Sequence, residues 1–250
     1  MNLSHVRVLV TRPEPQAQAL TDAINEAGGH AWSMPMLGIN ALTETLAIKN
    51  CLLMFDQFDR IIVTSSSAAR LGMDLIEQYW PQLPIHIQWF AIGASTASEL
   101  EYFGVRAVFS NQGVNSEALL DLDSFIDVKG ENVLIIKGVG GRELLAEQLA
   151  NSGAHVQKLE VYRRFCPTYQ RNAVVKKLES NTINVILCGS GETLTNLGYY
   201  LPISYRASYR LLVPSARVAK QAHGLGFQRV TNACGASNDT MLLALEAIPT

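Results

Sequence analysis

The sequence predicts an α/β protein with two similar doubly wound domains, each built on a largely parallel sheet. Strand-like and helix-like segments alternate along almost the whole chain, which is typical of this fold class. Three of these strand–helix units recur in the same order about 120–126 residues later, a spacing close to the size of one domain. A chain of 250 residues has room for two such domains.

The first unit begins with the β-branched run VRVLVT (6–11), and a helix with apolar residues at helical spacing follows it. Two glycines at 28 and 29 end that helix. The remaining five units begin in the same way, with a short apolar run that leads into small or hydroxylated residues. These runs are RIIVTS (60–65), WFAIG (89–93), NVLIIKG (132–138), NVILCGSG (184–191) and RLLVPS (210–215).

The recurrence pairs the units across the two halves. VLVTRP resembles VLIIKG, RIIVTSSSAA resembles NVILCGSGET, and FAIGASTASEL resembles LLVPSARVAKQ. Between the pairs, MPMLGINAL (34–42) and VYRRFCP (161–167) occupy matching positions and are interpreted as crossovers between domains. If both stretches cross, the chain changes domains twice, and the two domains are not simply the first and second halves of the sequence.

The bulk composition restricts the function classes. A net charge of −2 gives no overall field for nucleic acid or for a membrane surface. The four cysteines are scattered without a C-x-x-C pair, which favours reduced thiols, and no apolar run approaches the roughly 20 residues of a membrane span. The N-terminus enters a strand-like run at once, without the pattern of a signal peptide. These features predict a cytoplasmic protein.

The six loops that follow the strands form the candidate site. In a parallel sheet they emerge at the carboxyl edge, where ligands bind in open α/β folds, and the N–H groups of the following helices can hold anions. For any one loop taken alone, plain N-capping by Ser and Thr is the favoured explanation. All six together, with Arg12, Lys137, Arg142 and Arg217 beside them, favour an anion site.

Other catalytic signatures are absent from the sequence. The stretch G138-V-G140-G141-R142-E143 lacks the last glycine of a dinucleotide fingerprint, and IIVTSSSAA lacks a G-x-S-x-G nucleophile elbow. No pair of histidines has metal-ligand spacing, so no metal site is expected. Asn115 or Ser116 is a good N-cap for the helix that follows, and capping is favoured over ligand contact there. Tyr162, in LEVYRRF, is either a packing residue or a hydroxyl donor facing an interdomain cleft.

Seven motifs in the same order resemble the uroporphyrinogen-III synthase family along essentially the whole chain. They are VTRP, TSSSA, AIGASTA, NSEALL, KGVGGREL, LEVYRR and PSARVA. The resemblance implies two α/β domains joined by a two-stranded connector, with the active site in the cleft between them. On this sequence it implies one discontinuous domain over 1–36 and 168–250, an inserted domain over 40–163, and connectors at about 35–41 and 161–168. It also implies a cofactor-free reaction on hydroxymethylbilane, a linear tetrapyrrole with eight carboxylates, in which loss of the ring-A hydroxyl gives an azafulvene cation. Ring D then closes the macrocycle through a spiro intermediate and is inverted in uroporphyrinogen III.

The resemblance also suggests roles for residues. Tyr162 matches the family tyrosine proposed to act as the acid, and Ser65, Thr96, Ser190 and Ser215 match loop positions implicated in substrate contact. VPSARVA departs from the usual A-I-G-x-T-T-A, so Arg217 is a candidate carboxylate partner in place of the usual last-loop hydroxyls. The candidate substrate-binding residues are Thr11, Arg12, Ser65, Ser66, Thr96, Asn115, Lys137, Gly138, Arg142, Ser190, Gly191, Ser215 and Arg217.

Two functions therefore remain open. The first is a cyclising enzyme of tetrapyrrole biosynthesis, expected to be a monomer that needs no cofactor and receives its substrate from hydroxymethylbilane synthase. It would bind neither nucleic acid nor membrane. The alternative is a non-catalytic two-domain module that binds a small polyanion with the same loops.

Overall fold

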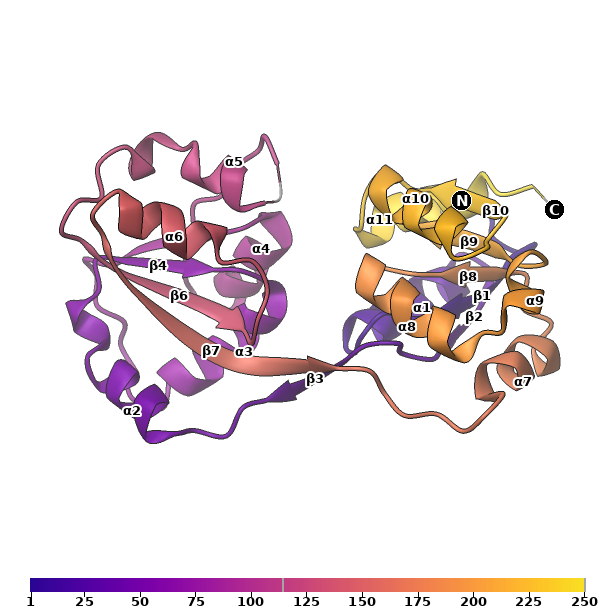
Figure 1. Ribbon diagram of the computed structural model, residues 1–250, viewed down its shortest axis with the longest axis horizontal. Coiled ribbons are helices and arrows are strands. Elements are labelled where there is room, and N and C mark those ends of the chain that lie inside the picture. Colours follow the sequence, from indigo (N-terminus) through magenta and orange to yellow (C-terminus); the bar gives the residue numbers. More distant parts are fainter. Residues whose placement is uncertain (114, 250) are drawn as a thin grey trace. The chain divides into compact units, whose positions relative to one another are not determined.

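The chain divides into two compact units (Figure 1). A computed structural model describes residues 1–113 and 115–249. Unit 1 comprises Met1–Ile39 and Phe165–Thr250, and unit 2 comprises Asn40–Arg164. The chain passes from one unit to the other twice, so unit 1 is assembled from two separate pieces of sequence.

Unit 1 contains a five-stranded sheet in the order β10-β9-β8-β1-β2, and its neighbouring strands pair in parallel. The strands are β1 (Arg7–Val10), β2 (His30–Ser33), β8 (Val185–Leu187), β9 (Arg210–Val213) and β10 (Arg229–Asn232). The helices are α1 (Gln16–Glu26), α7 (Ala173–Ser180), α8 (Gly191–Tyr200), α9 (Ile203–Arg206), α10 (Ala216–Gly224) and α11 (Asn238–Glu246).

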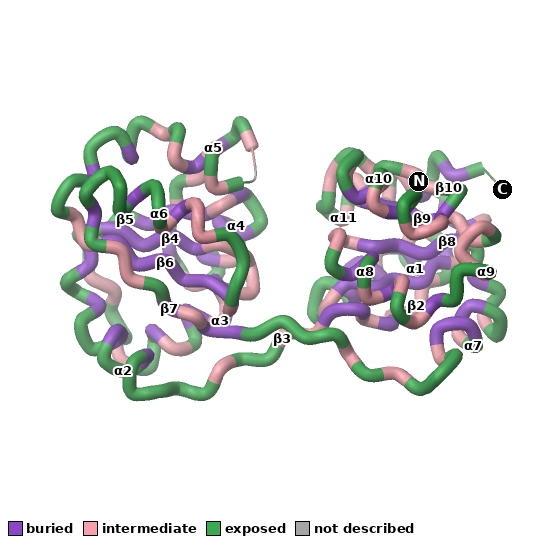
Figure 2. Tube along the Cα trace, viewed as in Figure 1, coloured by how far each residue is buried: buried purple, intermediate pink, exposed green. Residues whose placement is uncertain are grey.

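This sheet is covered by helices on both faces, which explains why its central strands are apolar except for the arginines that begin β1 and β9. In β1, Leu9 packs into a core that includes residues of α7, α8 and α10, while Val8 and Val10 pack into a second core with α1 and α11. A parallel strand buried on both faces has no position left for a polar side chain. Figure 2 shows the central strands as the most continuously buried segments.

Unit 2 contains the second five-stranded sheet, in the order β3-β7-β6-β4-β5, with parallel pairing from β7 through β5. The strands are β3 (Gly38–Ala41), β4 (Arg60–Val63), β5 (Gln88–Ala91), β6 (Asn132–Gly138) and β7 (His155–Phe165). The helices are α2 (Leu46–Leu53), α3 (Ser66–Ile76), α4 (Ala94–Tyr102), α5 (Ser116–Leu120) and α6 (Leu144–Asn151), with short 3-10 turns at Phe55–Gln57 and Asp123–Phe125.

The two sheets have the same strand order. The series β2-β1-β8-β9 in unit 1 corresponds to β7-β6-β4-β5 in unit 2, and the position of β10 corresponds to Val108, which forms a parallel bridge beside β5. The three sequence pairs therefore occupy equivalent places in similar folds, and the predicted fold class is confirmed. The equivalence also makes Arg12 the counterpart of Lys137, and Ser190 the counterpart of Ser65.

Candidate active site

A cavity of about 490 Å³ lies in unit 2 at the carboxyl edge of its sheet. The loops after β4 and β6, the start of α5 and one face of β7 line it. This is the edge at which open parallel sheets bind ligands. The cavity brings together six of the predicted site residues, which are Ser65, Asn115, Lys137, Gly138, Arg142 and Tyr162.

The hydroxyls of Ser65 and Tyr162 meet in this cavity. Ser65 is the N-cap of α3 and accepts a hydrogen bond from the Ala68 N–H at 3.1 Å. Its Oγ also lies 3.2 Å from the Tyr162 hydroxyl, and either oxygen can be the donor. The Tyr162 residue is only 6% exposed, so its ring is packed while its hydroxyl lies among the residues that line the cavity.

A bulge in the sheet positions the tyrosine. Lys137 on β6 pairs with Glu160 on β7, but Gly138 pairs with Tyr162, so one β7 residue is skipped. Such a bulge redirects the side chains that follow it. It brings the Tyr162 ring against Gly138, where an added Cβ would lie 2.5 Å from the ring Cζ and 2.9 Å from the hydroxyl oxygen. Only glycine fits beside the ring in this position.

Two lysines that line the cavity share the carboxylate of Glu143, which is not itself a lining residue. The Lys137 ammonium lies 3.1 Å from one Glu143 oxygen, and the Lys158 ammonium lies 2.6 Å from the other. Hydrogen bonds from Lys158 and then from Lys137 lower the pKa of Glu143 below its ordinary value, and the bond to Glu143 raises the pKa of Lys158. Glu143 therefore holds both ammonium groups in place.

Four cationic side chains line the cavity, and three of them pair with Glu143 or Glu117. Lys137, Arg142, Lys158 and Arg164 all line the cavity, and within the described part of the chain no carboxylate residue is among its lining. Arg142 forms an exposed ion pair with Glu117 at 3.3 Å. Asn115 caps α5 by accepting a hydrogen bond from the Ala118 N–H at 2.8 Å, as its residue type predicts. A cavity of this kind is suited to a ligand with several carboxylates.

Unit 1 has a smaller hollow of about 150 Å³ at the equivalent edge, lined in part by Arg12, Gly189 and Ser190. Arg12 is 5% exposed and donates to Asn238 Oδ1 at 2.9 Å and to the Ala236 carbonyl at 2.5 Å. Burial lowers the pKa of its guanidinium. These two bonds hold the loop before α11 and leave other N–H groups of the five-donor guanidinium for a ligand.

The other predicted residues lie outside these two cavities. Thr11 is fully buried and donates its hydroxyl to the Leu187 carbonyl at 2.8 Å, and Thr96 is 4% exposed on α4. Ser66 opens α3 directly after its N-cap. Gly191 opens α8, and Ser215 caps α10, where Arg217 passes close to Gly191. Substrate contact by these residues remains a prediction.

The sequence analysis missed Glu143, Lys158 and Arg164. The usable signal was the period of two along β7, because Lys158, Tyr162 and Arg164 fall on alternate positions of one extended run. Glu143 follows Arg142 directly at the start of α6. An acidic residue at a helix start is usually explained by its favourable interaction with the helix dipole, so it gave no indication of a site.

Among residues 1–113 and 115–249, no group of three or more His, Cys, Asp or Glu side chains could hold a metal ion. Over the same residues, no helix combines the length and the apolar character that a membrane span requires.

The fold and the cavity define an α/β protein with a cavity lined by four cationic side chains at the carboxyl edge of a parallel sheet. A family model described as uroporphyrinogen-III synthase HemD matches residues 18–242. The uroporphyrinogen-III synthase of Escherichia coli K12 is 31% identical over 96% of this chain and 99% of its own length. That of Salmonella typhimurium LT2 is 32% identical over 96% and 99%. The chain therefore belongs to the uroporphyrinogen-III synthase family, as its motifs predict.

Solved structures of the same name share the fold. A mutant uroporphyrinogen III synthase from the extreme thermophile Thermus thermophilus superposes with a TM-score of 0.62 at 16% identity, covering 96% of this chain and 97% of that one. The uroporphyrinogen-III synthetase of Helicobacter pylori 26695 gives 0.58 at 13% identity, covering 96% and 99%. The family consists of cyclising enzymes of tetrapyrrole biosynthesis, so the enzyme prediction is favoured over the non-catalytic binding module.

Proposed function

We propose that this chain cyclises hydroxymethylbilane to uroporphyrinogen III, with inversion of ring D and loss of water, and that it uses no cofactor. One observation carries the proposal for the site. The Tyr162 hydroxyl, held by Ser65, lines a cavity whose wall carries four cationic side chains. Carboxylates of the substrate would bind the cations, and the reacting carbon would lie near the phenol.

The substrate is positioned by its carboxylates in this proposal. Lys137 and Lys158 already share Glu143, and a substrate carboxylate can replace or join that bridge. Arg142, 74% exposed at its side chain, can turn from Glu117 toward a ligand at little cost because exposed ion pairs are weak. Holding a flexible chain in one geometry is the main source of rate and of isomer control in a ring closure.

Tyr162 acts as the general acid. The C–O bond of the hydroxymethyl group breaks, the leaving oxygen takes the phenolic proton, and water departs. The electron pair of the pyrrole nitrogen then stabilises the cation. The Ser65 hydroxyl can donate to the resulting phenolate across the 3.2 Å contact. A proton released when the macrocycle regains its aromatic pyrroles restores the phenol, so the cycle is neutral overall.

The remaining parts of the proposal concern the surroundings of the enzyme. We infer a cytoplasmic monomer that takes hydroxymethylbilane directly from hydroxymethylbilane synthase, and that binds neither nucleic acid nor membrane. The net charge of −2 and the scattered spacing of the four cysteines, without a C-x-x-C pair, support this setting.

The deciding experiment supplies purified protein with freshly prepared hydroxymethylbilane, oxidises the products and resolves the porphyrin isomers. The enzyme yields the type III isomer, whereas spontaneous closure in the protein-free control yields type I. Type I product alone, from protein shown to be folded, would refute the proposed activity.

A further inference from the structure

A second cavity of about 330 Å³ lies in unit 1, at the amino ends of β1, β8, β9 and β10. This is the edge of the sheet opposite to the three strand-to-helix loops of unit 1. Its polar lining consists of His5, Asn184, Ser208, Tyr209, Arg210 and Arg229. We call it the amino-edge cavity, and the function proposed above makes no use of it.

Two arginines stand side by side in this cavity. Arg210 and Arg229 are the first residues of β9 and β10, and they are direct partners in the parallel register of these strands. Neighbouring strands lie about 4.8 Å apart, so the two side chains start from adjacent points on the same face. Like charges in such a pair repel and destabilise the sheet. Within residues 1–113 and 115–249, neither guanidinium has a hydrogen bond or an ion pair.

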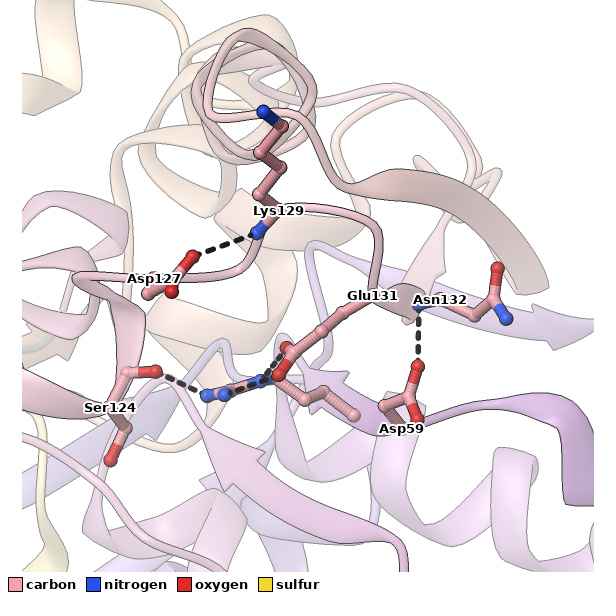
Figure 3. Close-up of polar contacts among 7 residues, drawn as sticks. Asp59, Ser124, Asp127, Lys129, Glu131 and Asn132 are labelled. Carbon is pink, nitrogen blue, oxygen red and sulfur yellow. Dashed lines mark hydrogen bonds and ion pairs between the residues drawn. The ribbon is translucent and has the colours of Figure 1, made fainter.

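At the equivalent edge of unit 2, the arginine that begins a strand is paired with a carboxylate. Arg60, the first residue of β4, donates two hydrogen bonds to the carboxylate of Glu131, one of them from Nη2 at 2.9 Å, and a third to the Ser124 carbonyl. Figure 3 labels Glu131 and Ser124, whose oxygens accept these hydrogen bonds. The fold can therefore neutralise an arginine at this edge with an acid of its own.

The amino-edge cavity has no such acid. No Asp or Glu occurs among its described lining residues. Glu179 accepts a hydrogen bond from Tyr205 at 3.3 Å and does not line the cavity. Arg7 at the start of β1 is engaged elsewhere, because it stacks over Trp32 and donates to the Asn181 carbonyl. Among the described residues, two arginines without a carboxylate partner thus face a space large enough for a small ligand.

The rest of the polar lining supplies donors on a rigid wall. Asn184 donates to the His5 carbonyl at 2.9 Å, and the His5 ring bonds to the Ile248 carbonyl at 3.0 Å, which fixes this side of the cavity. Ser208 and Tyr209 add hydroxyls. Planar guanidinium forks bind tetrahedral oxyanions bidentately, and two forks side by side suit a doubly charged ligand.

We propose that the amino-edge cavity binds a small phosphate-type dianion between Arg210 and Arg229. The ligand is either free inorganic phosphate or the phosphate group of a small metabolite. The volume exceeds what phosphate alone needs, and the anion would relieve the repulsion within the arginine pair. This cavity shares no lining residue with the cavity of Tyr162. Binding of an anion here can therefore be measured directly, without measuring enzyme turnover.

The first test measures binding of inorganic phosphate and of glycerol 3-phosphate by calorimetry at constant ionic strength, with chloride as the reference salt. The wild type binds one equivalent in a saturable way. Arg210→Gln and Arg229→Gln each weaken binding at least tenfold. The control is Arg171→Gln, an exposed arginine of the same unit that lines neither cavity, and it binds within twofold of the wild type.

The second test uses thermal unfolding, which separates a ligand site from a structural pair. Without phosphate, Arg229→Gln unfolds at the same temperature as the wild type or higher, because a like-charge contact is removed. With phosphate, the wild type gains stability by mass action and the variant does not. Arg229→Lys keeps the charge without the fork and falls between the two.

The comparison of ligands identifies the source of the anion. Tighter binding of glycerol 3-phosphate indicates a metabolite, and equal binding indicates free phosphate. The proposal is overturned if the wild type shows no saturable binding, if Arg210→Gln binds as the wild type does, or if Arg171→Gln loses binding to the same extent.

Discussion

The hydroxyl oxygens of Ser65 and Tyr162 lie 3.2 Å apart, although one residue caps a helix and the other lies on the longest strand of the second sheet. The contact ties the start of α3 to β7 across the ends of β4 and β6. It gives the phenol a partner that can both accept and donate a hydrogen bond. The chemistry proposed for Tyr162 depends on this pair.

Tyr162→Phe removes the phenolic proton and keeps the ring packing. We expect kcat to fall about 100-fold or more, as for the loss of a general acid, while KM stays nearly unchanged. Steady-state kinetics with fresh hydroxymethylbilane measures both. Tyr102→Phe, at a residue that is 87% exposed on α4, is the matched control and keeps wild-type turnover. Unchanged kcat in Tyr162→Phe would remove its role as the acid.

Gly138→Ala tests the position of the same ring. The new Cβ would lie 2.5 Å from the Tyr162 Cζ, so the ring must move, at a stability cost of about 1–3 kcal/mol. We expect kcat to drop at least as far as in Tyr162→Phe, with the fold retained by circular dichroism. Gly224→Ala meets no atom within 4 Å in α10 and serves as the control with normal activity. Full activity in Gly138→Ala would contradict the packing argument.

Ser65→Ala separates helix capping from function. Ser65 and Ser237 both cap helices with their hydroxyls, and only Ser65 lines the cavity. Loss of either cap costs about 1 kcal/mol in free energy of unfolding. Denaturant titration should show this loss in both alanine variants, whereas turnover should fall only in Ser65→Ala. Equal turnover in the two variants would mean that Ser65 caps the helix and has no role in the reaction.

Glu143→Gln tests the carboxylate shared by Lys137 and Lys158. The pKa of Glu143 is lowered in the folded protein, so its bridge stabilises the fold above the ordinary glutamate pKa and is lost as the pH falls through the lowered value. The wild type should therefore exceed Glu143→Gln in stability at pH 7, and the difference should vanish below roughly pH 4. Urea titrations across this range measure it.

The same variant should change substrate affinity. Without the competing carboxylate, both lysines are free for the substrate, and KM should fall by up to about fivefold, the scale of an exposed ion pair. Glu101→Gln, on the exposed surface of α4, is the control and should leave KM unchanged. A raised KM would mean that Glu143 is needed to place the lysines.

The fold was largely predictable because its central strands are apolar on both faces and the following residues cap helices. Ser65, Ser190, Ser215 and Asn115 all occupy N-cap positions, as their residue types indicate. The order of the repeated units then specified which strands correspond. Each of these signals is local or repeats along the chain.

The site was less predictable because it depends on register and on side-chain direction. The bulge at Gly138 decides which β7 residue meets the ring, and no local pattern encodes it. Lys158 in mid-strand and Glu143 at a helix start each read as ordinary surface charges until pairing brings them together. Thr11 shows the converse, since a hydroxyl at the end of a strand turns into the core.

The two passages of the chain between units have a consequence for synthesis. A ribosome releases β1, α1 and β2 first, then the whole of unit 2, and only afterwards β8, the strand that completes the pairing of β1. Until then one edge of β1 and its apolar face lack their partners, and such edges invite aggregation. Unit 2 is continuous in sequence and can fold during this interval. The part of the protein made first is therefore the part finished last.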